Sequence, residues 1–212
     1  MEGIEVKLID SMGGDLSIVN SARTSFAKWK EEMDEKDERL VSYLGENKHI
    51  TPFRHNCLQF MCTAPVFIAR QLMKHQAGLT WSERSMRYLD EPVGYFVPEY
   101  WRERPDKSIK QGSAGKHDNS DMFDHLYTEL LDKSCDLYEE MIKDGVAPEM
   151  ARMVLPQSML VTWVWTGNLM AFAHVYNLRI KSNAQIEAQE FAKALAEEIP
   201  ESFKIGWEAL TK

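Results

Sequence analysis

The chain has 212 residues, a formal net charge of −8 at pH 7 and three cysteines. This length suffices for one domain with a large core, and no linker rich in Gly, Ser or Pro divides it, so we expect one domain over residues 1–212. The negative charge disfavours nucleic acid as a partner, because binding to nucleic acid needs a positive field.

The composition predicts a reduced, cytoplasmic protein. Cys57, Cys62 and Cys135 are odd in number and lie in apolar surroundings rather than in a paired framework. The first residues lack a basic start and an apolar core of signal-peptide length. No apolar stretch approaches the roughly 18 residues of a membrane helix, so we expect no membrane partner.

The N-terminal part of the chain predicts one strand and two helices. Residues 4–10 alternate in the manner of a strand, residues 11–15 break it as a turn, and a helix begins at Asp15. Residues 28–47 are charged and predict a solvent-facing helix, to which we assign no chemistry. Its narrow apolar stripe consists of Met33, Leu40, Val41 and Leu44.

The next segment, residues 56–69, is mostly apolar and predicts a core strand that runs into a helix. That helix would carry Arg70 and Lys74 on one face and Gln71 and His75 on the adjacent face, because residues four apart are neighbours on a helix. These polar side chains would then lie at the edge of the core.

The remaining elements follow from turn residues and periodicity. Residues 92–119 mix Pro, Gly and charges and predict a loop that covers a site, whereas residues 121–143 have the apolar period of a core-packed helix. A short helix over 148–152, a strand over 159–166, a helix capped by Asn168 and a last helix over 183–198 complete an α/β (α+β), helix-rich outline.

A dense group of cations, a carboxylate, an imidazole and a hydroxyl occupies residues 70–76 and 83–88. Guanidinium groups and hydroxyls donate charge-assisted hydrogen bonds to phosphate, so this group predicts a site for a small phosphorylated ligand. Ser85 and Arg87 would point the same way from an extended loop, and arginines from later segments would complete one pocket. These later residues are Arg152 and Arg179.

Gln71 presents a donor and an acceptor together, which matches the imide edge of a pyrimidine. An arginine near that edge would stabilise the negative charge left when the imide proton is lost.

Other chemistries are disfavoured. His49, His55, Cys57 and Cys62 do not have zinc-ligand spacing, so we expect no metal. No cysteine lies beside a base, and no phosphate-binding glycine loop occurs, so any flavin or nicotinamide needs a site outside the Rossmann type. The aromatic pair at 163 and 165 is more typical of core packing than of ring stacking on a ligand.

Several ordered motifs resemble those of the flavin-dependent thymidylate synthases, and the resemblance covers nearly the whole chain. The matching segments are residues 22–25, 49–55, 64–71, 74–88, 151–156, 165–168, 177–179 and 184–185.

The resemblance implies conversion of dUMP to dTMP, with methylenetetrahydrofolate as carbon donor and NADPH as reductant through bound FAD. It implies that no enzyme cysteine acts as the nucleophile. It also implies a family-specific fold, a sheet flanked by helices, and a homotetramer whose active sites are shared between subunits. The small molecules dUMP and folate are then the partners.

Site residues carry over by position. Arg179 matches the arginine beside the uracil that favours its ionised form, and it is the expected catalytic group. Expected dUMP contacts are Gln71, Lys74, Glu83, Arg84, Ser85, Arg87, Arg152 and Arg179. Expected FAD contacts are Thr51, Lys74, His75, Gln76, Glu83, Asn168 and His174, and His49 matches a histidine near the flavin and folate.

The chain also departs from the family pattern. Residues 74–76 are Lys-His-Gln instead of Arg-His-Arg, and Ser82-Glu83 replaces an Asn-Glu pair one residue later than usual. Met86 replaces a common Gly, Met170 replaces an Arg, and His174 replaces an Asn. We therefore expect the flavin phosphates and adenine to be held differently. These departures from the family signature are compatible with a virus-encoded copy that acts in a host cytoplasm.

Two alternatives remain open. One is a related flavoenzyme that methylates or hydroxymethylates another pyrimidine nucleotide, because Met86 and the extra loop residue adjoin the nucleotide segment. The other is a catalytically silent module that binds a nucleotide or a flavin, which the retention of the expected site residues disfavours.

Overall fold

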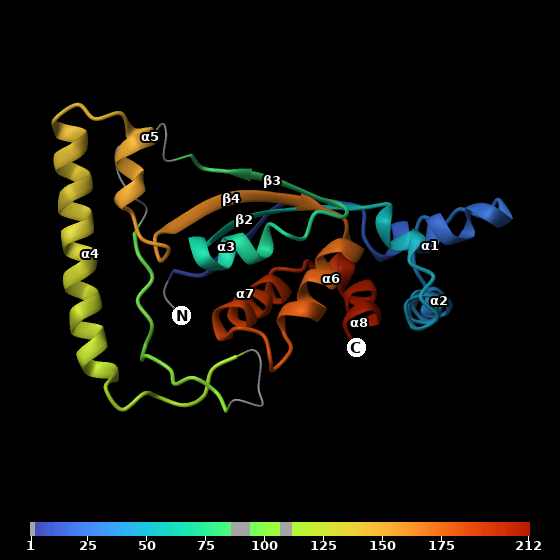
Figure 1. Cartoon of the computed structure of the whole chain (residues 1–212). Helices are drawn as coiled ribbons and strands as arrows, with labels where there is room; N and C mark the ends of the chain where they lie inside the picture. Colours follow the sequence, from blue (N-terminus) through green and yellow to red (C-terminus); the bar gives the residue numbers. More distant parts are fainter. Residues whose placement is uncertain (1–2, 86–93, 107–111) are drawn as a thin grey trace.

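A four-stranded antiparallel sheet forms the centre of the computed structural model, which describes residues 3–85, 94–106 and 112–212 (Figure 1). In order across the sheet, the strands are β1 (Glu5–Met12), β2 (Cys57–Pro65), β4 (Leu160–Gly167) and β3 (Leu79–Glu83). Every neighbouring pair is antiparallel. β4 therefore lies between the long strand β2 and the short edge strand β3.

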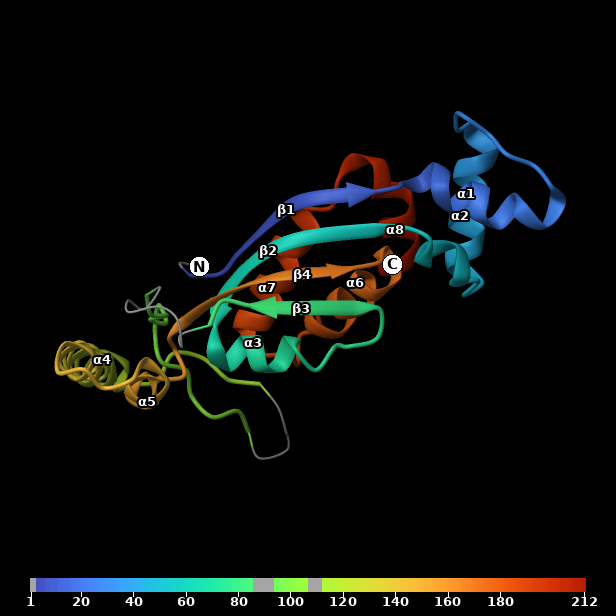
Figure 2. The ribbon, with the colours of Figure 1, turned by 90° about the horizontal axis from the view of Figure 1, so that it is seen from above.

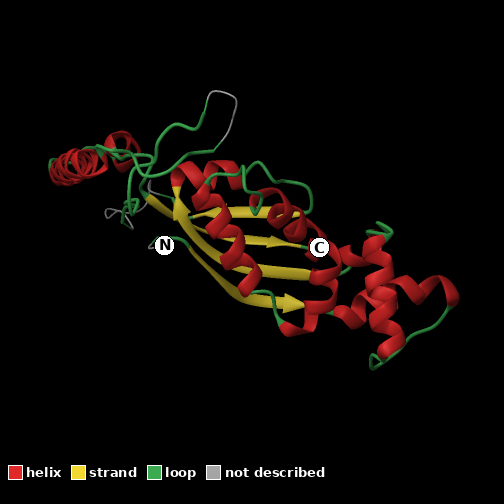
Figure 3. Ribbon diagram, turned by 90° about the horizontal axis from the view of Figure 1, so that it is seen from below, coloured by secondary structure: helices red, strands yellow, loops and turns green. Residues whose placement is uncertain are grey.

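Four helices cover one face of this sheet, as Figure 3 shows from the helical side. They are α3 (Val66–Leu72), α6 (Leu169–Arg179), α7 (Ile186–Glu197) and α8 (Lys204–Thr211). The opposite face carries none of the described helices (Figure 2).

Further helices extend beyond both ends of the sheet. One end carries α1 (Asp15–Arg23) and α2 (Glu35–Glu46), and the other carries α4 (Ser120–Lys143) and α5 (Pro148–Ala151) (Figure 2). The chain also makes 3-10 turns, which are η1 (Thr24–Phe26), η2 (Thr51–Arg54), η3 (Arg152–Val154) and η4 (Glu201–Phe203). No helix in the described ranges has the length and apolarity that crossing a membrane requires.

The core lies between the sheet and its helices. Along β2, alternate side chains are fully buried, as expected of a strand with one face against the core. On β4, Trp163 and Trp165 are each 1% exposed, and the Trp165 ring lies 5.4 Å from that of Phe172 on α6. The prediction that both tryptophans pack in the core is confirmed.

The main strands and several helix starts are confirmed. β1 lies where alternation predicted a strand, β2 and β4 lie where apolar, β-branched and aromatic residues predicted strands, and a helix begins at Asp15. Asn168 caps α6 as predicted, because its side chain accepts a hydrogen bond from the Ala171 amide at 3.0 Å. In the described parts of the predicted loop over 92–119, isolated bridges such as Tyr95 with Met159 are the only strand-like pairings.

Other expectations near the N-terminus are wrong in detail. β1 continues to Met12, so the turn starts at Gly13 rather than at residue 11. The helix expected over 28–47 is α2 alone, because Asp34 caps its start. Its charges are not all solvated, since Asp37 is fully buried and pairs with the cations Arg23 and Lys30.

The expectations around the predicted site also need correction. α3 ends at Leu72, so Lys74 and His75 follow the helix instead of sharing its faces with Arg70 and Gln71. The strand β3 was not predicted, because only five residues form it and several of them are polar.

Two later expectations also need correction. α4 packs on the core along only part of its length, because Tyr138 is fully buried there while several of the apolar residues expected to be buried are exposed. The helix predicted as the last one is followed by α8, which packs Trp207 against Tyr176 of α6, with the ring centroids 5.2 Å apart.

We predict that Trp165→Ala lowers the free energy of unfolding by about 3–5 kcal/mol, because it opens a cavity among Trp81, Phe172 and Phe191. Trp29→Ala is the matched control, since Trp29 is 76% exposed. Denaturant titration at equal protein concentration measures both changes. Equal losses in the two variants would contradict the assignment of this core.

Candidate functional site

A cavity of about 590 Å³, which we call the β3 pocket, opens beside the edge strand β3. Arg70 reaches it from α3, Arg84 and Ser85 from the end of β3, and Arg152 from η3. The Arg84 amide donates a hydrogen bond to the Thr162 carbonyl at 2.9 Å, which extends the pairing with β4. Backbone pairing therefore fixes the position of the polar residues at this end of the sheet.

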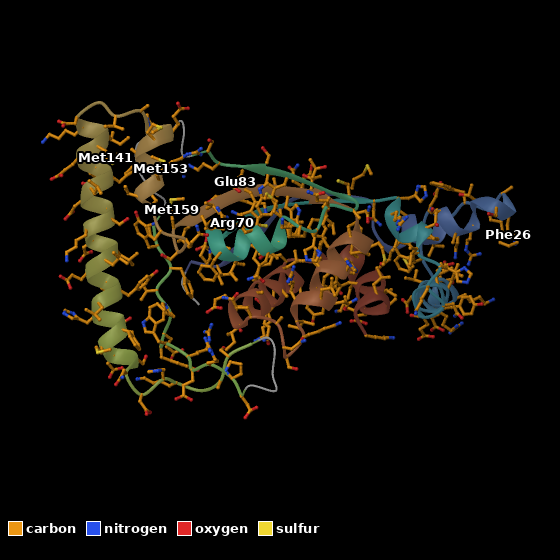
Figure 4. The ribbon with its side chains drawn as sticks, in the orientation of Figure 1. Phe26, Arg70, Glu83, Met141, Met153 and Met159 are labelled. Atoms are coloured by element: carbon orange, nitrogen blue, oxygen red, sulfur yellow. The ribbon has the colours of Figure 1, made fainter. Side chains whose placement is uncertain are left out.

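The β3 pocket gathers positive charge. Arg70, Arg84 and Arg152 are exposed, and none of them pairs with a carboxylate in the parts of the chain that the structure describes. Glu83 also lines the pocket, and its carboxylate accepts a hydrogen bond from Trp81 Nε1 at 3.2 Å. Figure 4 labels Arg70 and Glu83, which lie on the neighbouring elements α3 and β3. Guanidinium forks around one cavity can bind phosphate.

A second cluster forms where α6 ends beside the segment after α3. Arg179 Nε donates a hydrogen bond to His75 Nε2 at 3.1 Å, and Arg179 Nη2 donates to the Gln71 carbonyl at 3.0 Å. Gln71 Nε2 in turn donates to Gln185 Oε1 at 2.7 Å. We call Arg179, His75 and Gln71 the Arg179 cluster.

His75 is a neutral imidazole in this cluster, because its Nε2 accepts a hydrogen bond and so carries no proton. Burial, which is the largest cause, and the electrostatic effects of Arg179 and His174 together lower the pKa of His75 to about 4. Burial also lowers the pKa of the Arg179 guanidinium from its ordinary value. Arg179 pairs with no carboxylate among the described residues, so its charge is available to an anionic ligand.

A second cavity of about 380 Å³, the α6 pocket, lies at the start of α6. Asn168, Met170 and His174 line it from the helix and its cap, and Arg54 lines it from η2. Gly78 completes the wall with a φ of +76°, and a Cβ there would lie 2.9 Å from Asn168 Nδ2. The close approach of these two segments therefore requires glycine at position 78.

The residues expected to contact dUMP do not all line one cavity within this chain. Glu83, Arg84, Ser85 and Arg152 line the β3 pocket, which Arg179 does not line. Within this chain Arg179 does not join these residues, and the expectation that all of them bind one nucleotide stays a prediction. Arg87 lies outside the described residues.

The expected flavin residues are also divided. Asn168 and His174 line the α6 pocket, and His75 belongs to the Arg179 cluster. Thr51 begins η2, and the His49 ring stacks on Tyr43 with centroids 6.2 Å apart. The side chains of Lys74 and Gln76 are exposed after α3.

Sequence reasoning missed Arg54. It lies in the motif over 49–55, three residues after Thr51, but no spacing rule linked it to Asn168 and His174. Arg70 was part of the predicted cationic group, yet it had no assigned contact until the structure placed it in the β3 pocket.

Comparisons with known proteins give one consistent result. The family model described as thymidylate synthase complementing protein matches residues 7–203. The chain is 36% identical over 207 residues to the flavin-dependent thymidylate synthase of Kosmotoga olearia, covering 96% of this chain and 88% of that protein. A protein of the same name from Thermus thermophilus is 33% identical over 204 residues, covering 96% of this chain and 74% of that protein.

Solved structures of a UMP/dUMP methylase, PolB from Streptomyces cacaoi, are also similar. The structure with 5-Br dUMP has a TM-score of 0.86 at 28% identity and covers 98% of this chain and 94% of that chain. The structure with 5-Br UMP has a TM-score of 0.86 at 26% identity and covers 100% and 95%.

We predict that the His75 imidazole stays neutral from pH 8 down to pH 5, which its ¹⁵N chemical shifts measure. Because its folded pKa of about 4 lies below the ordinary value of 6.5, the unfolded chain binds the extra proton first. This histidine therefore makes folding less favourable as pH falls from 6.5 towards 4.

Arg179→Leu should raise the pKa of His75 but leave it below 6.5, because burial is the larger cause of the shift. A midpoint near 6.5 in the wild-type protein would contradict the hydrogen bond from Arg179.

Proposed function

Because this chain belongs to the thymidylate synthase complementing proteins, whose relatives are named flavin-dependent thymidylate synthases, we propose that it converts dUMP to dTMP. It is a methyltransferase by family. We propose methylenetetrahydrofolate as carbon donor, NADPH as reductant and FAD as the bound flavin. The observation that carries the nucleotide part is the β3 pocket, where three guanidinium groups without carboxylate partners among the described residues surround one cavity.

The β3 pocket would hold the 5′-phosphate of dUMP. Arg84 and Arg152 supply charged donors, and Ser85 supplies a hydroxyl. Arg87, expected from the sequence to bind the same phosphate, lies outside the described residues. Glu83, at the rim of the same pocket, would lie between the nucleotide and the flavin.

The Arg179 cluster would hold the uracil. Gln71 and Lys74 would contact the base, and Arg179 would stabilise the negative charge that forms when the imide proton leaves. His75 and the Gln71 carbonyl fix the direction of the guanidinium before the nucleotide arrives, so little reorganisation accompanies the reaction.

The flavin supplies reducing equivalents when bound. Expected contacts are Thr51, Lys74, His75, Gln76, Glu83, Asn168 and His174, with His49 near the flavin and folate. The α6 pocket supports this placement, because it combines an amide cap with basic side chains, which suit an anionic cofactor. A cysteine nucleophile is disfavoured, since burial raises the pKa of the Cys62 thiol and no cysteine lines the β3 pocket.

We propose that the protein assembles as a homotetramer in which the β3 pocket of one subunit faces the Arg179 cluster of another. The separation of Arg179 from this pocket within one chain supports such sharing. An apolar stripe on α4 also supports assembly, because its side chains recur with heptad-like spacing but are exposed. The stripe consists of Phe123, Leu126, Leu130 and Leu137.

A second candidate is methylation of a related uridine nucleotide. The similarity to PolB, which is named a UMP/dUMP methylase, favours this alternative over other pyrimidine chemistries. For either substrate, we propose small-molecule partners only, without nucleic acid, and the cytoplasm as the compartment.

We predict that the purified protein binds FAD and forms dTMP from dUMP only when methylenetetrahydrofolate and NADPH are both present. Chromatographic product analysis with each component omitted in turn measures this requirement. Faster methylation of UMP than of dUMP would favour the second candidate. A protein that forms no product and cannot be reconstituted with flavin would instead be a silent module.

We predict that Arg152→Ala and Arg179→Ala are each nearly inactive as homo-oligomers but regain activity when the two chains are co-expressed. If each site takes the two arginines from different subunits, about a quarter of the sites in randomly mixed oligomers contain both. Arg39→Ala, on an exposed face of α2, is the control that should keep full activity. Mixed oligomers without regained activity would contradict the shared site.

A further inference from the structure

Arg54 is a basic residue to which sequence reasoning assigned no role. It is the last residue of η2, is exposed, and lines the α6 pocket together with Asn168 and His174. It makes no hydrogen bond or ion pair with any residue in the ranges 3–85, 94–106 and 112–212. Its guanidinium is therefore free to bind an anion in that pocket.

The position of Arg54 relative to α6 is fixed by a buried amide. Asn56 is 6% exposed, and its Oδ1 accepts a hydrogen bond from the Leu169 amide at 2.8 Å. Its Nδ2 donates to the Phe53 carbonyl at 3.1 Å, and Phe53 is fully buried. One side chain thus joins the turn that carries Arg54 to the first residue of α6.

The α6 side of the pocket carries no guanidinium or ammonium group. Met170 lines the α6 pocket there with an uncharged thioether. A thioether donates no hydrogen bond to phosphate, so this side of the pocket contributes no charge. Arg54 adds a guanidinium to the same cavity from the opposite segment.

We propose that Arg54 binds the diphosphate of the flavin dinucleotide and so supplies the guanidinium that the α6 side of the pocket lacks. This inference rests on the proposed function and names a binding residue within it. The connection through Asn56 fixes the backbone of the turn that carries Arg54 relative to the start of α6, so the guanidinium stays within reach of the α6 pocket. His174, on the next turn of α6, lines the same cavity.

The test is titration of the flavin-free protein with FAD and with riboflavin, followed by flavin fluorescence. Arg54→Gln should raise the Kd for FAD about tenfold, as loss of one charge-assisted contact predicts. The Kd for riboflavin should stay unchanged, because riboflavin has no phosphate. Arg39→Gln is the matched control, since Arg39 is exposed on α2 and lines neither the β3 pocket nor the α6 pocket.

The double variant Arg54→Gln/Met170→Arg should restore binding, because it places a guanidinium on α6 in the same pocket. It should bind FAD more tightly than Arg54→Gln alone. The inference is overturned by an unchanged Kd for FAD in Arg54→Gln, by an equal loss of riboflavin binding, or by a double variant that gains nothing. A wild-type protein that binds no flavin would contradict the proposed function itself.

Discussion

The pairing of β4 with β2 on one side and β3 on the other positions both candidate pockets. One end of β4 follows η3, which carries Arg152, and the other end passes through Gly167 directly into the cap of α6. Gly167 lies opposite both Leu58 and Leu79, and a Cβ there would lie 2.5 Å from the Gly78 carbonyl oxygen. Because glycine allows this approach, a single strand places both the β3 pocket and the α6 pocket.

The distribution of charge gives these pockets their chemistry. The chain is acidic overall, and the buried carboxylate of Asp37 has the cationic partners Arg23 and Lys30, which offset its desolvation. The arginines at the β3 pocket, the α6 pocket and the Arg179 cluster have no carboxylate partner among the described residues. Positive charge is therefore left for ligands at a few places on a negative molecule, which favours small anions over long anionic polymers.

The sequence predicted the strands that pack one face on the core. It did not predict the burial of a helix face whose contacts are made with another part of the protein or with another molecule. Apolar, β-branched and aromatic residues identified β2 and β4, because one face of each packs on the core. The period of α4 correctly indicated an apolar face, but a pattern cannot say which molecule covers that face. Motifs likewise indicated the residues of the candidate site. They could not reveal that Arg179 lies apart from the β3 pocket or that Arg54 meets Asn168, because both facts depend on contacts between distant segments.

A crystal structure of the assembled protein with FAD and 5-bromo-dUMP would show whether two subunits share each nucleotide site, because it locates both ends of the nucleotide at once. We expect the phosphate to lie between Arg84, Ser85 and Arg152 of one subunit and the uracil to lie beside Arg179 of another. A nucleotide held by one chain alone, or a phosphate bound away from the β3 pocket, would contradict it.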